Sequence, residues 1–208
     1  MNCEQVMRLA PVIPVIRIDR LADAVPMARA LVNGGLKALE VTLRTPVALE
    51  AMALIAREVP DAVVGAGTVR TPAQLDAAIK AGAKFAVSPG LTRELALAER
   101  DSAISLLPGV ATASEIMQAT EWGFDRLKLF PAMEIGGPRL AKAFSGPFAD
   151  VKFCPTGGIS PANAPEWLAL PNILCVGGSW MLPAASVDAG DWAHVEALAR
   201  EAAALPRP

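Results

Sequence analysis

The sequence predicts a single (β/α)8 barrel, a TIM barrel, with a short N-terminal helix. Short apolar runs alternate with longer amphipathic runs from one end of the 208-residue chain to the other. Eight such units fit this length at about 26 residues each, which leaves little room for insertions. No linker, low-complexity segment or shift in composition divides the chain, so we expect one domain over residues 1–208.

We expect a strand in each of the eight apolar runs. Strands that alternate with helices pair in parallel through right-handed crossovers. A doubly wound open sheet has the same alternation and is the alternative fold. The expected strands are Val12–Ile18, Ala38–Arg44, Ala62–Val69, Phe85–Pro89, Ile104–Pro108, Arg126–Phe130, Val151–Thr156 and Ile173–Val176.

Helical patterns precede the first strand and follow each strand. Met1–Ala10 has a helical pattern that contains Glu4 and Arg8, so we do not expect a signal peptide there. After the first strand, apolar residues line one helical face until Gly34-Gly35 ends the helix. Further helix starts are expected at Thr71-Pro72, at Ser160-Pro161, and at Thr112 with Glu115 as a capping box.

Composition excludes several classes of protein. Hydrophobic residues make up 53% of the chain and charged residues 19%, which excludes a disordered chain. The net charge of −2 provides no basic surface for nucleic acid. Trp167–Val187 contains no charge, but Pro and Gly pairs interrupt it, so we do not expect a membrane span. Three scattered cysteines argue for a reducing, cytoplasmic location and against structural zinc.

The residue types available also narrow the chemistry. The chain has no Tyr and one His, His194, in the terminal helical pattern. A His-based triad or a zinc site with several His ligands therefore cannot be assembled. Acid, base and nucleophile roles fall to Glu, Asp, Lys, Cys, Ser or Thr. In a barrel, the site lies at the carboxyl ends of the strands, and we look for such residues there.

The second strand places an acid and a guanidinium on one face. With a period of two, Glu40, Thr42 and Arg44 point to the side opposite Leu39 and Val41. The apolar row is expected to pack against helices, which leaves the polar row inside the barrel. Buried charges there are costly unless they are paired or used. A structural ion pair and a catalytic role are both open at this point.

The sixth strand places a lysine inside the barrel. Arg126, Lys128 and Phe130 share one face of this strand. Burial can lower the pKa of a lysine by as much as ~3–5 units, and a neutral amine attacks carbonyls to form a Schiff base. The alternative is a lysine that extends to the barrel rim. Glu40 and Arg44 on another inward face favour the chemical role.

Glycine and small polar residues follow the last two strands. The segments are Thr156-Gly157-Gly158 and Gly177-Gly178-Ser179. Loops after strands seven and eight of a barrel often hold phosphate, because glycine lets backbone N–H groups approach the oxyanion. We expect a phosphate here, with a carboxylate as second choice. The third strand ends in Gly65-Ala66-Gly67-Thr68, which is consistent with binding of a carboxylate or carbonyl.

Together these segments resemble the class I aldolases of the KDPG/KHG family, where KDPG is 2-keto-3-deoxy-6-phosphogluconate and KHG is 4-hydroxy-2-oxoglutarate. The likeness runs in order along essentially the whole chain. It implies a homotrimeric (β/α)8 enzyme of the Entner–Doudoroff pathway that cleaves KDPG into pyruvate and glyceraldehyde 3-phosphate. It implies no metal or other cofactor. The matching segments are Leu39–Thr45, Val64–Thr68, Ser88–Gly90, Lys128–Ala132, Phe153–Ile159 and Gly177–Trp180.

The resemblance also implies a role for each site residue. Lys128 is the expected Schiff-base lysine and Glu40 the expected proton acceptor. Arg44 and Thr68 match the neighbourhood of the pyruvyl carboxylate, and Pro89 and Phe130 match the pocket lining. The expected phosphate end comprises Gly157, Gly158, Gly178 and Ser179, with Thr156 beside the pocket.

Other activities remain open from the sequence. The galactonate epimer of the substrate or 4-hydroxy-2-oxoglutarate could also be accepted, and Thr156 is the first residue to examine for this choice. A phosphate-binding barrel synthase or isomerase of the thiamine-phosphate-synthase kind would use Lys128 to pair with phosphate and would need Mg²⁺. A non-catalytic barrel that binds a phosphorylated metabolite would leave a buried Glu40 unexplained. We expect Cys154 to be a core residue rather than a nucleophile.

Overall fold

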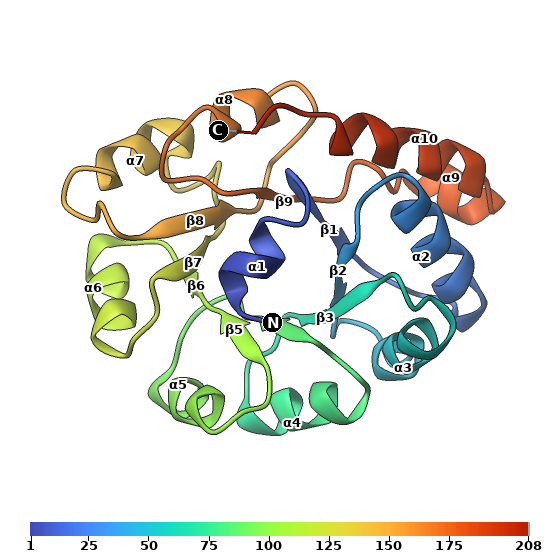
Figure 1. Ribbon diagram of the computed structural model, residues 1–208, viewed down its shortest axis with the longest axis horizontal. Helices are drawn as coiled ribbons and strands as arrows, with labels where there is room; N and C mark the ends of the chain where they lie inside the picture. The colour runs from blue at the N-terminus through green and yellow to red at the C-terminus, as the bar shows by residue number, and fades with distance from the viewer. Residues whose placement is uncertain (208) are drawn as a thin grey trace.

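Nine parallel strands curl into a ring, and helices cover the outside of this ring (Figure 1). The computed structural model describes residues 1–207. The strands are β1 (Val12–Ile16), β2 (Ala38–Thr42), β3 (Val63–Gly67), β4 (Phe85–Val87), β5 (Ser105–Leu107), β6 (Gly109–Val110), β7 (Arg126–Leu129), β8 (Lys152–Pro155) and β9 (Val176–Gly178).

The nine strands form eight barrel positions. One sheet runs β5-β4-β3-β2-β1-β9 and the other runs β6-β7-β8. Only Pro108 separates β5 from β6, and because proline has no N–H to donate, the ladder is interrupted there. Bridges from Phe153 to Ile173 and from Thr156 to Gly177 join the edge at β8 to the edge at β9. The predicted (β/α)8 barrel is thereby confirmed.

Helices follow the strands around the barrel. They are α1 (Cys3–Met7), η1 (Leu21–Asp23), α2 (Ala24–Asn33), α3 (Ala48–Glu58), α4 (Pro72–Lys80), α5 (Arg93–Arg100), α6 (Ala113–Glu121), α7 (Gly137–Phe144), α8 (Ala164–Leu168), α9 (Ala184–Ala189) and α10 (Trp192–Ala203). The caps predicted at Thr71 and Thr112 are confirmed, because each hydroxyl accepts the N–H three residues later. Gly34 ends α2 as predicted.

Two boundaries differ from the sequence prediction. The helix expected at Ser160-Pro161 begins later, at Ala164, because the Asn163 side chain holds the preceding turn: it accepts the N–H of Ser160 and donates to the carbonyl of Gly158. The sequence predicts the last strand at Ile173–Val176, and that prediction is wrong by about three residues. Ile173 makes only an isolated bridge, and the regular strand contains the two glycines instead.

The core has two layers, one on each side of the strands. The larger cluster lies between the strands and the helices, and it includes Leu39, Val41 and Leu127. A smaller cluster fills the barrel interior, where Val6 and Met7 of α1 pack with Phe85 and residues of the neighbouring strands. α1 lies across the centre of the ring in Figure 1 and closes its N-terminal end. No helix within residues 1–207 is long and apolar enough to span a membrane.

Candidate active site

A lysine and a glutamate face each other inside the barrel. Lys128 on β7 donates a hydrogen bond from Nζ to Oε1 of Glu40 on β2, over 3.1 Å. Each side chain is only 4% exposed. The predicted placement of both groups in one interior is therefore confirmed. Two charges in such a dry place are stable only because each neutralises the other, so neither can be removed without leaving its partner unpaired.

Phe130 covers the amine. Lys128 and Phe130 are two residues apart and share a face of the chain. Lys128 Nζ lies 5.4 Å from the centroid of the Phe130 ring, within the range of a cation–π contact. The ring therefore packs beside the amine at the carboxyl end of β7.

Arg44 and Thr68 meet at the carboxyl ends of β2 and β3. Arg44 donates from Nε to the Thr68 hydroxyl over 2.9 Å, and the guanidinium is otherwise exposed at the mouth of the barrel. Thr68 has a φ of 60°, the only positive value among the described non-glycine residues. A β-branched residue in this region is strained by about 1–3 kcal/mol, and such strain is typical of functional sites.

A cavity of about 170 Å³ opens beside Arg44 at the carboxyl ends of the strands. Most of the expected substrate-binding residues line it. From the sequence prediction these are Arg44, Phe130, Thr156, Gly157, Gly158, Gly178 and Ser179. They come from the ends of β2, β7, β8 and β9, which the barrel brings together at one end.

The loop after β8 presents free backbone donors to this cavity. Gly157 and Gly158 have φ values of 105° and 70°, which a side chain would strain. Within residues 1–207, neither glycine donates its N–H to another protein group. A backbone of this kind has N–H groups available for an anion such as phosphate.

Thr156 contributes an unsatisfied hydroxyl. The residue is 6% exposed and lines the cavity, and its Oγ1 has no hydrogen-bond partner in the described chain. Buried polar groups almost always have partners, so an orphaned hydroxyl in a cavity indicates a place for a ligand group.

Some lining residues differ from the expectation. Pro89 follows β4, is exposed, and does not line the cavity; its carbonyl faces Gly109. Val15, Ile159 and Gly177 do line it and were missed. The period-two pattern of the first strand could have indicated Val15, because it shares the inner face with Ile13.

Arg17 is a further residue that the sequence reading missed. It lies with Ser179 along an adjoining cavity of about 240 Å³. Its guanidinium is engaged by both carboxylate oxygens of Asp19 at 3.0 Å. A cation therefore lies next to the expected phosphate end. The signal for it is its parity with Val15 in the expected first strand, Val12–Ile18.

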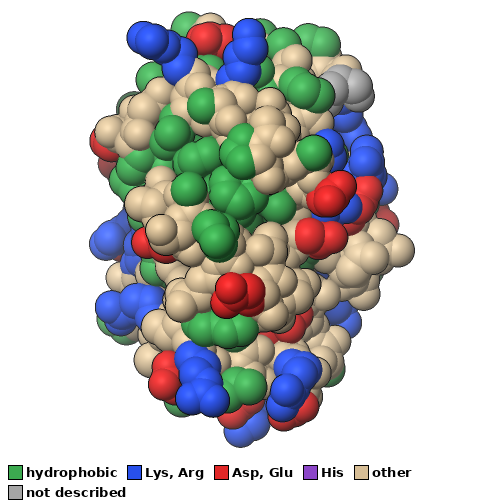
Figure 2. Space-filling view, turned by 90° about the vertical axis from the view of Figure 1, so that its left-hand side faces the viewer, with side chains coloured by type: hydrophobic (Ala, Val, Ile, Leu, Met, Phe, Trp, Pro, Cys, Tyr) green, Lys and Arg blue, Asp and Glu red, His purple; other side chains and the backbone are tan. Residues whose placement is uncertain are grey.

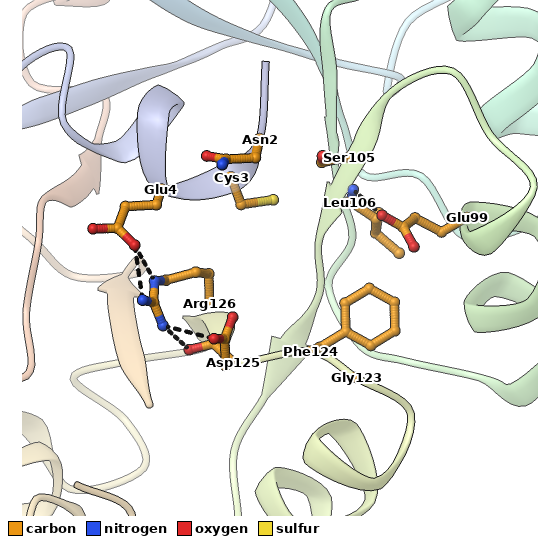
Figure 3. A pocket seen from close by; sticks show the side chains of 10 residues that line it. All are labelled: Asn2, Cys3, Glu4, Glu99, Ser105, Leu106, Gly123, Phe124, Asp125 and Arg126. Atoms are coloured by element: carbon orange, nitrogen blue, oxygen red, sulfur yellow. Dashed lines mark hydrogen bonds and ion pairs between the residues drawn. The ribbon is translucent and has the colours of Figure 1, made fainter. Parts of the chain in front are cut away.

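A larger cavity, of about 310 Å³, lies at the opposite end of the barrel (Figure 3). There Arg126 binds Glu4 of α1 at 2.7 Å. Burial raises the pKa of the Cys3 thiol to about 12, and burial also raises the pKa of the Glu99 carboxyl. This protonated thiol is a poor nucleophile. Because the N-terminal end of a barrel serves stability rather than catalysis, we place the active site at the other end.

The remaining sulfur and metal-ligand candidates are structural. Cys154 and Cys175 are buried in the inner cluster, which confirms the prediction of a core role for Cys154. Burial, followed by a hydrogen bond with Cys154, raises the pKa of the Cys175 thiol. Within residues 1–207, no group of three or more His, Cys, Asp or Glu side chains converges in a way that could hold a metal.

Comparisons with known proteins place the chain in one enzyme family. The family model for KDPG and KHG aldolase matches residues 3–198. The 2-dehydro-3-deoxy-phosphogluconate aldolase of Pseudomonas aeruginosa is 58% identical, over 94% of this chain and 89% of that protein. The KHG/KDPG aldolase of Escherichia coli K12 is 51% identical, over 97% of this chain and 94% of its own length.

A solved structure gives the same result. The crystal structure of a KDPG aldolase from Legionella pneumophila superimposes with a TM-score of 0.95 at 49% identity, covering 97% of this chain and 98% of that one. In it, pyruvate is captured as a covalent carbinolamine intermediate. A carbinolamine forms when an amine adds to a carbonyl, so that protein uses the amine chemistry that the sequence predicts for Lys128.

Proposed function

Because the chain belongs to the KDPG and KHG aldolase family, we propose that it is a class I aldolase that reversibly cleaves KDPG to pyruvate and glyceraldehyde 3-phosphate. The observation that carries this proposal is the buried contact of 3.1 Å between Lys128 Nζ and Glu40 Oε1. It puts a nucleophile for the ketone and a proton acceptor for the reacting hydroxyl within reach of one another.

Lys128 opens the reaction. Glu40 accepts a proton from the Lys128 ammonium, the freed amine adds to C2 of the keto acid, and the carbinolamine loses water to give a protonated imine. Glu40, 3.1 Å away, is placed to move protons in both steps. The imine matters because breaking the C3–C4 bond leaves an electron pair on C3, and the cationic nitrogen accepts that pair as an enamine.

Glu40 then completes the cleavage. Its carboxylate takes the proton of the C4 hydroxyl while the C3–C4 bond breaks, and glyceraldehyde 3-phosphate leaves. The enamine takes up a proton at C3, and water releases pyruvate and regenerates the amine. A base placed in this way accelerates proton transfer by about 10²–10⁴-fold. No metal or other cofactor takes part in this scheme.

The other site residues hold the two ends of the substrate. Arg44 and Thr68, joined at 2.9 Å, bind the carboxylate, and a guanidinium makes charge-assisted bonds with it. The phosphate lies against the loops after β8 and β9, at Gly157, Gly158, Gly178 and Ser179, which share one cavity. Phe130 forms an apolar side of the pocket.

Trapping with borohydride tests the proposal. We expect the purified chain to gain the mass of one reduced pyruvate when it is incubated with pyruvate and sodium borohydride. The Lys128→Ala variant should gain none, and Lys80→Ala, which changes an exposed lysine at the end of α4, should gain it fully. An unmodified wild-type chain, or an adduct that survives Lys128→Ala, contradicts the proposal.

The substrate range is a second question. The E. coli relative is named for both KHG and KDPG, and we propose that this chain also cleaves 4-hydroxy-2-oxoglutarate. The Thr156 hydroxyl, which has no hydrogen-bond partner in the described chain, is our candidate for recognising the configuration of the substrate at C4. A comparison of kcat/KM for the gluconate and galactonate epimers decides between them, and equal values contradict a gluconate preference. Full activity in EDTA excludes a Mg²⁺-dependent synthase or isomerase.

We also propose a homotrimer in the cytoplasm. Hydrophobic side chains gather on the face toward α6 and α7 (Figure 2). Met117 of α6 is 56% exposed, and Met133, in the turn between β7 and α7, is 38% exposed. A second copy of the chain would cover such a surface. Three free cysteines fit a reducing compartment. Sedimentation velocity tests the oligomer, and a monomer at micromolar concentration contradicts it.

A further inference from the structure

Strand β3 has no side chain at two successive inward positions. Val63, Gly65 and Gly67 share the face toward the barrel interior, and Val63 packs on the inner cluster there. Side chains from the neighbouring strands fill the two vacant places. The Phe85 ring from β4 lies over Gly65, and the Glu40 side chain from β2 lies over Gly67.

The fit between Gly67 and Glu40 is close. A Cβ atom at position 67 would lie 2.5 Å from Glu40 Oε1, 2.6 Å from its Cγ and 3.0 Å from its Cδ. Carbon atoms prefer separations of about 3.5–4.0 Å, so one methyl group here would displace the carboxylate. Gly67 does not have a positive φ, so its backbone would accept alanine. The requirement for glycine is therefore one of space.

We infer that Gly67 is a positioning residue, whose missing side chain sets the Glu40 carboxylate where it reaches Lys128. This inference rests on the proposed function, because the position of Glu40 matters for catalysis only if Glu40 moves protons. Glu40 is 3% exposed and is held between β3 and the amine. A carboxylate confined in this way has its geometry fixed before substrate arrives.

The direct test is Gly67→Ala. We expect kcat for KDPG cleavage to fall by about 10²-fold, because a misplacement of about 1 Å in a catalytic group can cost that much. A crystal structure of the variant should show Lys128 Nζ and Glu40 no longer within hydrogen-bond reach. A kcat within about twofold of wild type, or an unchanged separation of 3.1 Å, overturns the inference.

A double-mutant cycle separates positioning from general damage. In a Glu40→Ala background the displaced group is gone, so Gly67→Ala should change the residual kcat by no more than about twofold. If Gly67→Ala instead lowers activity as much without Glu40 as with it, Gly67 does not act through Glu40 and the inference fails.

Stability provides a second route should Gly67→Ala fold poorly. Glu40→Ala deletes Cγ, Cδ and Oε1, the three atoms that the new methyl group would strike. Glu40→Ala/Gly67→Ala should therefore have a Tm no lower than that of Glu40→Ala alone. A further fall in Tm shows that the methyl group does not act through Glu40 and overturns the inference.

Gly34→Ala is the matched control. Its new methyl group would strike Ala199 where α2 meets α10, far from the active site, and Gly34 also lacks a positive φ. It should lower the Tm while leaving kcat per folded molecule unchanged. A loss of kcat equal to that of Gly67→Ala shows that overpacking alone is responsible and overturns the inference. If wild type itself neither cleaves KDPG nor traps pyruvate, the proposed function fails instead.

Discussion

Removing one member of the buried pair should destabilise the chain more than removing both. Glu40→Leu leaves the ammonium of Lys128 in a place that is 4% exposed, without its partner at 3.1 Å. Breaking a buried pair in this way costs about 3–5 kcal/mol. Replacing both members with apolar residues of similar volume is close to neutral or stabilising by about 1–4 kcal/mol. The double variant Glu40→Leu/Lys128→Met should therefore recover most of the stability that each single variant loses.

Urea unfolding of wild type, the two single variants and the double variant, all at one protein concentration, measures these free energies. We expect a coupling energy of about 3 kcal/mol or more from the cycle. The double variant should also be inactive while being as stable as wild type or more so. Two results would refute this reasoning: single-variant losses in the free energy of unfolding below about 1 kcal/mol, or losses that simply add in the double variant. Either result would mean that burying the ion pair does not lower the stability of the chain for the sake of function.

Two further predictions concern residues near the two ends of the barrel. Thr68→Gly should raise the free energy of unfolding by about 1 kcal/mol, because glycine relieves the strained backbone. It should also weaken pyruvate binding, because Arg44 loses its hydrogen-bond partner. Lower stability, or an unchanged KM, contradicts this. Burial raises the pKa of Glu99 in the folded chain, so its contribution to stability is present below the unfolded pKa and is lost as pH rises through the folded pKa. In Glu99→Gln the Tm should therefore change less between pH 4 and pH 7 than in wild type, and the folded state should be favoured at pH 7. Thermal melts from pH 4 to 7 measure this. A Tm profile that runs parallel to that of wild type contradicts the prediction.

The sequence best predicts which side chains face the barrel interior where a charged residue lies within a strand of period-two pattern. Strand parity alone predicts that Glu40 and Lys128 lie in the barrel interior, and both are buried there. This works because apolar neighbours leave no doubt about which face of the strand packs on helices. The glycine segments after β8 and β9 were likewise placed at one end by the topology of the barrel, and they share a cavity.

What sequence could not predict depends on contacts across strands. No local signal gives Thr68 its positive φ, because threonine rarely adopts it. The contact of Gly67 with Glu40 joins two strands and needs the register to be known. The last strand was misplaced because Ile173–Val176 is more apolar than the glycine-containing segment that forms β9. Apolar content predicts burial there, but the side chains of Thr156 and Trp180 leave no room for a Cβ atom at Gly177 and Gly178, respectively.

The position of α1 has a practical consequence. The chain begins at the end of the barrel away from the catalytic cavity, where Met1 is 56% exposed and Glu4 anchors the helix to Arg126. An affinity tag or a tether to a solid support can be joined there without obstructing the entry of substrate. Removing the residues up to and including Met7 would instead take away the helix that closes the N-terminal end of the barrel and would admit solvent to the barrel interior. For an immobilised catalyst, extension at this terminus is harmless and shortening is not.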